Sequence, residues 1–278
     1  MAAEGRSAIE FYSRHPITAA LIRKRLSDAR GHLDALGPDE LFAHDQDHYG
    51  GLAANDALAE RGRITTGSRV VDFCAGLGGP ARYFAHRFGA DVTGVELTPA
   101  RVADAIDLTR LVGLENRVRI AEGDVMAAPL PDASADAVIS QEALLHVPDK
   151  ARALGEAFRV LRRGGRIAFT DWVVHRPLTA DDATILAEGM AARNLQNVSG
   201  YRDALSAAGF VEIVDEDLTL EWGPILEARF AMYRRLRDEA EKAGTPAGDD
   251  PFYRSYERLV ALVLGRSLGG ARFSATKP

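Results

Sequence analysis

The chain has 278 residues, of which 46% are hydrophobic and 27% charged, and this composition excludes a disordered or fibrous protein. Its formal net charge of −6 argues against nucleic acid as the main partner, because such binding needs clustered cations to neutralise phosphates. Cys74 is the only cysteine, which excludes an internal disulfide and a cysteine-rich metal site.

The beginning of the chain and its hydropathy bear on location. Residues 1–11 lack the basic and apolar regions of a signal peptide. Apolar runs also fall short of the roughly 20 residues needed to cross a bilayer. We therefore expect a cytoplasmic protein without a membrane partner, and a homo-oligomer remains open.

The first segment of the chain is predicted to be helical. Residues 7–36 have a helix-like pattern, with a break at Pro16 and a stop at Gly37-Pro38. A polar stretch ending in two glycines, residues 41–51, precedes a further short helix. We expect residues 1–62 to form an N-terminal helical segment that lies against the core.

Short apolar runs typical of buried parallel strands follow. They cover residues 68–73, 90–96, 118–124, 135–140 and 166–170. Helices are predicted between them, one from Pro80, one from Pro99 with Thr98 as its cap, and one from the Asp149 cap to Gly164-Gly165. This alternation implies βαβ units and a doubly wound, mostly parallel sheet of the α/β class, with a core over residues 63–175.

The pattern loosens after Trp172. The elements predicted there are helices over 178–197, 201–209, 224–243 and 252–264, strands over 211–218 and 271–276, and a loop over 244–251. The last strand returns after a helical excursion, as a reversed edge strand would, and brings the sheet to seven strands. We expect residues 176–278 to supply helical cap insertions over the substrate and the last two strands.

A glycine loop follows the first strand. Residues 76–81, Gly-Leu-Gly-Gly-Pro-Ala, satisfy the loose G-x-G-x-x-G/A fingerprint of dinucleotide-binding folds, and Glu96 lies where a ribose-binding acid would fall. Alone, this pattern suits a nicotinamide or flavin enzyme equally well. A nicotinamide-dependent oxidoreductase is therefore a distant alternative for the function.

Three further features distinguish the candidate cofactors. Asp72 ends the first strand, where an acid suits a cationic methionine-like group and would repel a pyrophosphate. Asp124 ends the third strand, where a carboxylate can accept a hydrogen bond from an adenine amino group while Val125 packs on the ring. The third feature is the reversed final strand.

Together these features resemble the class I S-adenosylmethionine-dependent methyltransferases, over roughly residues 65–175 and the last strand. The family motif is two hydrophobic residues followed by Asp-x-Gly-x-Gly-x-Gly, and residues 70–78 depart from it once, with Cys74 in place of the first glycine. The resemblance implies a Rossmann-like methyltransferase fold and S-adenosylmethionine as the cofactor. It places Asp72, Gly76 and Gly78 at the methionine end, Glu96 on the ribose hydroxyls and Asp124 on the adenine. The predicted cofactor-binding set is completed by Ala75, Leu97, Arg101, Val125 and Gln141.

The residues after the fourth strand are candidates for catalysis, since open α/β sheets bind ligands at this edge. Glu142 and His146 are four residues apart, so a helical turn would put both on one face. A carboxylate beside an imidazole can fix its tautomer and raise its basicity. The alternative is that His146 only caps or packs the next helix.

This stretch also resembles a narrower group, the sarcosine/dimethylglycine, phosphoethanolamine and tocopherol methyltransferases. Residues 140–150 are similar to that group's pattern of Ser, an acid and then His-x-Pro-Asp-basic, and residues 48–52 look like its tyrosine-and-glycine segment that folds over the cofactor. The resemblance implies that Tyr49 and His146 form a pair that closes the site and assists proton removal. Glu142 stands where the amine-methylating members have Asp.

We therefore expect methylation of a small-molecule acceptor, first of all N-methylation of a small amine or amino acid. C- or O-methylation of a natural-product or prenyl-type acceptor is the alternative. Candidate acceptor contacts in the cap are Trp172, His175, Arg176, Met190, Arg193, Trp222, Tyr233, Arg234 and Arg237.

The histidines and aspartates of residues 44–48 raise the question of a metal. His44 and His48 have the spacing of two ligands on one helix face. The adjacent Gly50-Gly51 and the flanking polar residues, Asp45 and Asp47 among them, favour a solvated or cofactor-closing loop instead. We predict no metal.

Overall fold

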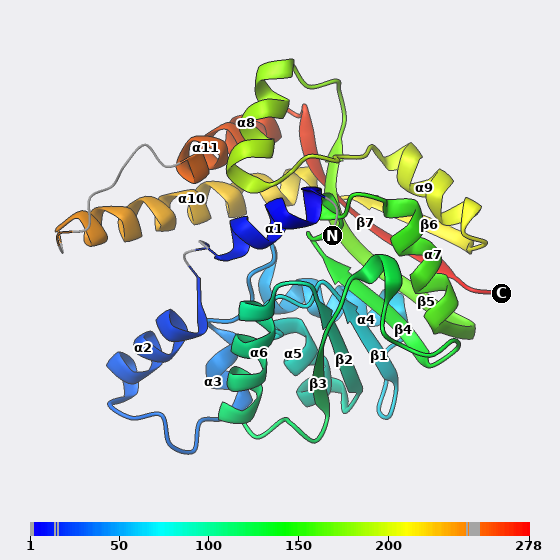
Figure 1. Cartoon of the computed structure of the whole chain (residues 1–278), viewed down its shortest axis with the longest axis horizontal. Helices are drawn as coiled ribbons and strands as arrows, with labels where there is room; N and C mark the ends of the chain where they lie inside the picture. Colours follow the sequence, from blue (N-terminus) through cyan, green and yellow to red (C-terminus); the bar gives the residue numbers. More distant parts are fainter. Residues whose placement is uncertain (1–2, 14, 16, 243, 245–250) are drawn as a thin grey trace.

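The structure is a computed structural model, and it describes residues 3–13, 15, 17–242, 244 and 251–278. Its centre is one seven-stranded sheet with the order β3-β2-β1-β4-β5-β7-β6 (Figure 1). The strands are β1 (Arg69–Phe73), β2 (Asp91–Glu96), β3 (Val118–Glu122), β4 (Ala135–Gln141), β5 (Leu161–Val174), β6 (Val211–Asp217) and β7 (Leu268–Thr276).

Strand directions confirm the predicted sheet. The five strands from β3 to β5 run parallel, and β7 runs antiparallel to both of its neighbours. The chain order reverses between β1 and β4, and ligands of open α/β sheets bind at such a switch point. The mostly parallel, doubly wound α/β fold is therefore confirmed.

The position of the last strand was predicted wrongly. β7 is reversed, as expected, but it lies between β5 and β6 rather than at an edge. β6 forms that edge, and its Val211 and Val214 are each 43% exposed. The apolar residues Ala271, Phe273 and Ala275 of β7 are buried, which fits an inner strand better than an edge.

Helices cover both faces of the sheet and one of its ends. In the described residues they are α1 (Ala3–Ser13), α2 (Ala19–Arg30), α3 (Pro38–Phe42), α4 (Gly51–Gly62), α5 (Gly79–Phe88), α6 (Pro99–Leu111), α7 (Lys150–Val160), α8 (Ala180–Met190), α9 (Val198–Ala207), α10 (Thr219–Lys242) and α11 (Pro251–Leu264), with 3-10 turns η1 (Val125–Ala127) and η2 (Leu144–His146).

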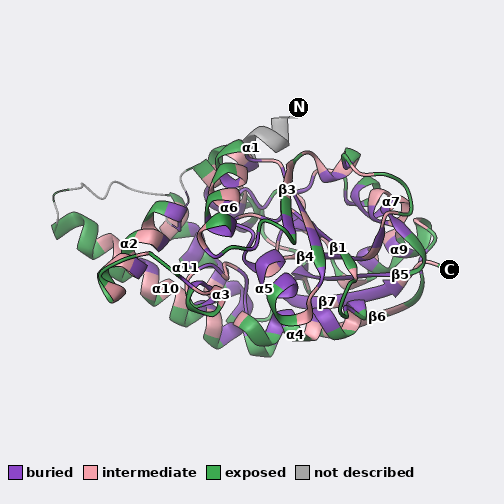
Figure 2. Ribbon diagram, turned by 90° about the horizontal axis from the view of Figure 1, so that it is seen from below, coloured by how far each residue is buried: buried purple, intermediate pink, exposed green. Residues whose placement is uncertain are grey.

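The sheet separates two hydrophobic cores. Successive strand residues point to opposite faces, so Val70 packs in the core that includes α4 and α5, and Val71 packs in the core that includes α7 and α9. The inner strands are largely buried, whereas the edge strands β3 and β6 and the outer faces of the helices are more exposed (Figure 2). This layering holds the carboxyl ends of the parallel strands in a fixed arrangement.

Three helices form a cap beyond those strand ends. α11 packs against both α8 and α10, and α1 lies between this group and the sheet, where it contacts η2 (Figure 1). The described helices include none that is both long and apolar enough to span a membrane.

Several predicted boundaries differ from the structure. Gly37-Pro38 begins α3 instead of ending a helix, because proline is tolerated in a first helical turn. Thr98 precedes α6 as expected, but its side chain makes no capping hydrogen bond, whereas Asp149 does cap α7. The predicted break at Pro16 and most of the predicted loop, residues 245–250, lie outside the described residues.

Two cap helices also differ in length from the prediction. α8 ends at Met190 because Ala191 takes a left-handed backbone conformation, with φ of 50°. α10 begins before Pro224, and the buried Trp222 and Leu226 on either side of this proline show that packing outweighs the one lost helical hydrogen bond. The proposed division at residues 62 and 175 stays a prediction.

Candidate active site

The glycine loop lies at the switch point of the sheet. After β1 the backbone enters the left-handed region at Cys74, Gly76 and Gly78, with φ values of 60°, 55° and 75°. Glycine adopts this conformation at little cost, and Gly78 forms the N-terminal cap of α5. The loop also approaches β2 closely, since a Cβ on Gly94 would lie 2.7 Å from that of Ala75.

Glu96 connects the loop to the end of β2. One carboxylate oxygen accepts a hydrogen bond from the Gly76 amide at 2.9 Å, and the other accepts from the Thr98 amide at 2.8 Å. Each oxygen keeps a lone pair for a ligand. Glu96 therefore fixes the glycine loop while its carboxylate stays available to the cavity beside it.

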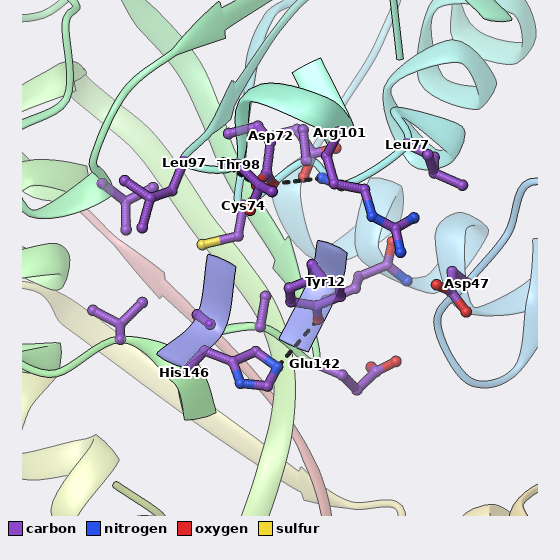
Figure 3. Close-up of a pocket in the computed structure, with 18 of the residues that line it drawn as sticks. Tyr12, Asp47, Asp72, Cys74, Leu77, Leu97, Thr98, Arg101, Glu142 and His146 are labelled. Atoms are coloured by element: carbon purple, nitrogen blue, oxygen red, sulfur yellow. Dashed lines mark hydrogen bonds between the residues drawn. The ribbon is translucent and has the colours of Figure 1, made fainter. Parts of the chain in front are cut away.

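A cavity of about 150 Å³ opens along this edge of the sheet (Figure 3). The predicted cofactor-binding residues that line it are Asp72, Ala75, Gly76, Glu96, Leu97, Arg101, Asp124, Val125 and Gln141. Gly78 is not among the lining residues. A Cβ at Gly78 would lie 3.0 Å from the Arg82 guanidinium, so this glycine makes room for a side chain behind the loop.

Several polar atoms of the cavity wall are buried without a hydrogen-bond partner. They belong to the Asp72 carboxylate, the Arg101 guanidinium and the Gln141 amide. Burial, with a further contribution from Glu96, raises the pKa of Asp72 to about 8. A buried cation beside Asp72 and an anion on Arg101 would satisfy both groups, and an α-amino acid carries both charges.

The opposite end of the cavity has a different character. Asp124 accepts a hydrogen bond from the Met126 amide at 2.8 Å, which leaves its second oxygen uncommitted, and Val125 is buried beside it. A hydrogen-bond acceptor next to an apolar surface fits an adenine, whose amino group can donate to the acceptor while the ring packs on the apolar surface. The cavity residues thus fit an amino acid group at one end and an adenine at the other.

A buried ion pair anchors the N-terminal loop to the glycine loop. The side chains of Arg82 and Asp45 are both 0% exposed, and the guanidinium donates to Asp45 at 2.8 and 3.1 Å and to the Leu77 carbonyl at 2.7 Å. A Cβ on Gly79 would lie 2.2 Å from the Asp45 carbonyl oxygen. The residues after Asp45 are therefore held directly over the start of α5.

Tyr12 of α1 closes the cavity from above. Its hydroxyl lies 3.1 Å from Nε2 of His146, and the Arg101 guanidinium lies 5.2 Å from the centre of its ring (Figure 3). Burial lowers the pKa of His146 to about 4, so the imidazole is neutral at pH 7. Nδ1 lies 3.3 Å from the Ala191 carbonyl, which can only accept, so Nδ1 carries the hydrogen and Nε2 accepts from the Tyr12 hydroxyl.

Glu142 has partners other than the one predicted. Its φ of 44° and the 3-10 turn after it keep Glu142 and His146 off a shared α-helical face. The carboxylate accepts from the Tyr49 amide at 2.7 Å and from the Thr170 hydroxyl. Burial raises the pKa of Glu142 to about 7, against the lowering effect of these two hydrogen bonds.

A second, smaller cavity of about 70 Å³ lies under the cap. Four residues line both cavities, namely Tyr12, Asp47, Glu142 and His146. The residues that line only the second cavity are Phe11, His15, Tyr49, Leu145, Trp172, Met190, Arg229, Tyr233, Phe252 and Tyr256. We call the first the cofactor cavity, the second the acceptor cavity, and the four shared residues the dividing wall.

The hydrogen-bond partner of His146 is a different tyrosine from the one predicted, and the catalytic pairing of Tyr49 with His146 stays a prediction. Tyr49 lines only the acceptor cavity, with its ring 4.8 Å from that of Trp222 and 5.0 Å from the Arg229 guanidinium. The tyrosine that contacts His146 is Tyr12, from the N-terminal helix. An aromatic pair at positions 11 and 12 was the available signal, but the sequence offered nothing to connect it with residue 146.

The cap contacts were predicted in part. Trp172, Met190 and Tyr233 line the acceptor cavity. The other candidates are not among its lining residues, namely His175, Arg176, Arg193, Trp222, Arg234 and Arg237. Arg229, one turn before Tyr233 on α10, is the inward arginine that the sequence did not reveal.

Two of the polar side chains of residues 44–48 bind other protein groups. His48 lies 2.9 Å from the Gln46 amide oxygen, and Asp45 binds Arg82. Across the described residues, no group of three or more His, Cys, Asp or Glu side chains is placed to hold a metal ion.

Comparison with known proteins identifies the family. Residues 71–169 match the model of a methyltransferase domain. Methyltransferase GfsG of Streptomyces halstedii is 33% identical over 224 residues, which are 78% of this chain and 80% of that protein. Sarcosine/dimethylglycine N-methyltransferase of Halorhodospira halochloris is 34% identical over 182 residues, and the match covers 63% of this chain and 61% of that protein.

A solved structure supports the same fold over the whole chain. Geranyl diphosphate C-methyltransferase of Streptomyces coelicolor A3(2), solved with Mg²⁺, geranyl diphosphate and S-adenosyl-L-homocysteine, aligns with a TM-score of 0.73. The alignment covers 100% of this chain and 98% of that one, at 18% identity. This similarity shows the Rossmann-like methyltransferase fold.

The glycine loop, the cavity chemistry and these matches define one class of enzyme. The chain belongs to the S-adenosylmethionine-dependent methyltransferases, and its acceptor is a small molecule. The choice of cofactor that the glycine loop alone left open is thereby settled, and the nicotinamide-dependent alternative is wrong.

Proposed function

We propose that the protein transfers the methyl group of S-adenosylmethionine to the nitrogen of a small amine. The observation that carries this proposal is the dividing wall, where two carboxylates, Asp47 and Glu142, stand beside Tyr12 and His146. Since this wall is common to both cavities, an acceptor that reaches the cofactor meets it first. Carboxylates there favour a basic nitrogen over an anionic or carbon nucleophile.

The rest of the acceptor cavity suits the same chemistry. Aromatic rings of Tyr12, Tyr49, Trp172, Tyr233 and Tyr256 face it, and such rings attract ammonium groups by about 0.5–2 kcal/mol each when desolvated. They also exclude water from the reacting atoms, which strengthens the remaining polar contacts.

The volume of the cavity favours a small acceptor. The acceptor cavity, of about 70 Å³, has about half the volume of the cofactor cavity, of about 150 Å³. It therefore suits an acceptor smaller than S-adenosylmethionine while α1 stays in place. A sterol or macrolide would require α1 or the cap to move.

The cofactor-binding roles are part of the proposal. Asp72 would bind the methionine ammonium, Arg101 its carboxylate, Glu96 the ribose hydroxyls and Asp124 the adenine amino group. Three of these roles are supported by the unpartnered or partly committed carboxylate and guanidinium groups of the cavity. Leu97, Val125 and Gln141 complete the wall around the cofactor.

Catalysis then rests on positioning and on removal of one proton. When bound, S-adenosylmethionine supplies an activated methyl group for in-line displacement. Tyr12 closes the site and orients the acceptor. His146 holds the Tyr12 hydroxyl in place by accepting a hydrogen bond from it. Glu142, with a pKa of about 7, is matched to accept the proton that the amine must lose at neutral pH.

Methyl transfer from labelled S-adenosylmethionine across an acceptor panel tests this proposal. The panel contains small amines, amino acids, phenols, natural-product hydroxyls and prenyl diphosphates. We expect label on amines, at a rate well above that of the other classes. Transfer confined to oxygen or carbon acceptors would show that the C- or O-methyltransferase alternative is correct.

A further inference from the structure

We propose that Arg229, Trp172 and Tyr256 form a carboxylate-binding subsite in the acceptor cavity. This inference rests on the proposed function and extends it, because it makes the acceptor an amine that also carries a carboxylate. The juxtaposition of one guanidinium and two unpartnered donors in one small cavity carries the inference.

The charged residues of the acceptor cavity differ in whether they also line the cofactor cavity. Asp47 and Glu142 belong to the wall shared with the cofactor cavity. Arg229 lines the acceptor cavity alone, and among its described lining residues it is the one Arg or Lys side chain. A bound zwitterion would therefore place its amine at the two carboxylates of the wall and its acid group at Arg229.

Arg229 is held in position by the N-terminal loop. Its two terminal nitrogens donate to the carbonyls of Asp47 and His48 at 3.0 and 2.8 Å, and its guanidinium lies 5.0 Å from the Tyr49 ring centre. The Asp47 carboxylate is 3.7 Å away, at the outer limit of an ion pair. The side chain is 17% exposed, so its charge is mostly removed from water and lacks a close carboxylate partner.

Two neutral donors line the same cavity without a satisfied hydrogen bond. Trp172 is 5% exposed, and its indole N–H, which can only donate, has no partner. Tyr256 is 3% exposed, and although its hydroxyl lies near that of Tyr49, it is also unsatisfied. Leaving a buried donor unpaired costs free energy, so a ligand whose hydrogen-bond acceptor atoms reach these two donors is favoured.

This set of donors fits a carboxylate better than a phosphate monoester. A carboxylate carries one negative charge, which the guanidinium balances while the two neutral donors complete its hydrogen bonds. A phosphate monoester carries nearly two charges and would stand near Asp47 with only one cation opposite. Carboxylate recognition by a planar guanidinium is also geometrically favoured.

Three secondary amines that differ only in their second functional group test the subsite. N-methylglycine carries a carboxylate, N-methylethanolamine a hydroxyl, and O-phospho-N-methylethanolamine a phosphate. For wild-type enzyme we expect kcat/KM to be highest for N-methylglycine. Because a hydrogen bond to a charged group contributes about 1.5–3 kcal/mol, the preference over N-methylethanolamine should be roughly tenfold or more.

Variants then assign the preference to residues. Arg229→Gln should remove most of it, chiefly by raising KM for N-methylglycine, and Arg229→Lys should restore part of it. Tyr256→Phe keeps the ring and removes one donor, and Trp172→Phe replaces the indole with a smaller ring that cannot donate. Each should lower kcat/KM for N-methylglycine by about 3–10-fold. Arg234→Gln, on the same helix but outside both cavities, should leave all three acceptors unchanged.

A binding measurement separates this inference from the proposed function. Calorimetric titration of the S-adenosylhomocysteine complex with N-methylglycine needs no methyl transfer, and we expect binding at least tenfold weaker in Arg229→Gln. If no amine is methylated but this binding loss is seen, the subsite stands and the proposed function fails. Equal binding in wild type and Arg229→Gln, no binding to wild type, or preference for the phosphate acceptor would each overturn the carboxylate subsite.

Discussion

The two cavities are built in different ways. The described lining of the cofactor cavity comes mostly from residues 72–148, at the ends of β1, β2, β3 and β4. The acceptor cavity is assembled from α1, the N-terminal loop, β5, α8, α10 and α11, which are far apart along the chain. The first therefore depends on local motifs in a fixed sheet, and the second depends on how distant helices pack.

Because the acceptor cavity determines which acceptor binds, acceptor specificity is harder to predict from the sequence than cofactor specificity. A cofactor site at a sheet edge recurs with the fold, whereas the cap can change the acceptor without disturbing the sheet. Asp45 and Arg82 connect the two sides, because they fix the loop that carries Asp47 and Tyr49 to the start of α5.

Breaking that connection should have the largest effect. Arg82→Met leaves the Asp45 carboxylate buried and unpaired, and loss of one partner of a buried ion pair costs about 3–5 kcal/mol. The free energy of unfolding, measured by urea denaturation, should fall by this amount. Arg87→Met, on the exposed face of the same helix, is the control and should change it by about 0.5 kcal/mol or less. Equal effects of the two variants would contradict the anchoring role.

Comparison of two tyrosines tests the dividing wall. Tyr12→Phe removes the hydroxyl that orients the acceptor and is bonded to His146. Because a misplacement of about 1 Å can cost about 100-fold in rate, kcat should fall by about this factor. Tyr49→Phe should change kcat by less than about threefold, because Tyr49 does not line the cofactor cavity. Steady-state kinetics at saturating cofactor measures both. The reverse order of effects would restore Tyr49 as the partner in catalysis.

His146→Ala tests the same pair from the other side. We expect a loss in kcat similar to that of Tyr12→Phe, with little further loss in the double variant, because the two side chains act as one unit. Full kcat with an unchanged pH profile would show that His146 only packs the next helix.

Asp72→Asn should separate binding from stability. Loss of the carboxylate should weaken S-adenosylmethionine binding by about 10–100-fold, because this ratio of affinities corresponds to the free energy of one hydrogen bond to a charged group. The pKa of Asp72, about 8 in the folded protein against 3.8 normally, means that the native state keeps a proton that the unfolded chain releases. Stability without cofactor therefore falls as pH rises from about 4 to 8.

An Asn side chain does not ionise, so Asp72→Asn lacks the loss of stability that wild-type Asp72 causes as the pH rises. Without cofactor, the variant should therefore melt at a higher temperature than wild type at pH 8. Calorimetry with cofactor and thermal unfolding without it measure the two effects. Glu122→Gln, at the exposed end of β3 and outside the cavity, is the control. Unchanged cofactor affinity in Asp72→Asn would contradict the ammonium-binding role.

The smallest effect is expected in the pH profile. If Glu142 accepts the amine proton, its pKa of about 7 makes the active carboxylate about tenfold more abundant at pH 8 than at pH 6. The ratio of wild-type kcat to that of Glu142→Gln should rise by this factor, and ionisation of the amine cancels in the ratio. A ratio that does not change with pH would exclude Glu142 as the proton acceptor.

The sheet and the cofactor cavity could be predicted because their signals are local. Asp72, Gly76 and Glu96 follow directly from the strand and glycine patterns, and the parallel sheet brings them to one edge. The order of the last two strands could not be predicted, because β7 pairs with β5 across nearly a hundred residues. Periodicity identifies a strand but not its neighbours.

The dividing wall and the acceptor cavity were predicted only in part. His146 and Glu142 were identified as candidates, but their partners come from positions 12, 49 and 170, and sequence spacing carries no information on such contacts. Arg229 was missed because its helix carries several arginines, and only the packing of α10 against the N-terminal loop shows which one turns inward.

In the proposed reaction, the methyl group passes across the dividing wall to the nitrogen of a small amine. Incubation of the wild-type enzyme with ¹³C-methyl S-adenosylmethionine and an equimolar mixture of N-methylglycine, a phenol and a prenyl diphosphate tests it in one proton–carbon correlation spectrum, because N-, O- and C-methyl groups resonate at different shifts. We expect label in the N-methyl signal. Label in an O-methyl or C-methyl signal with none on nitrogen would contradict it.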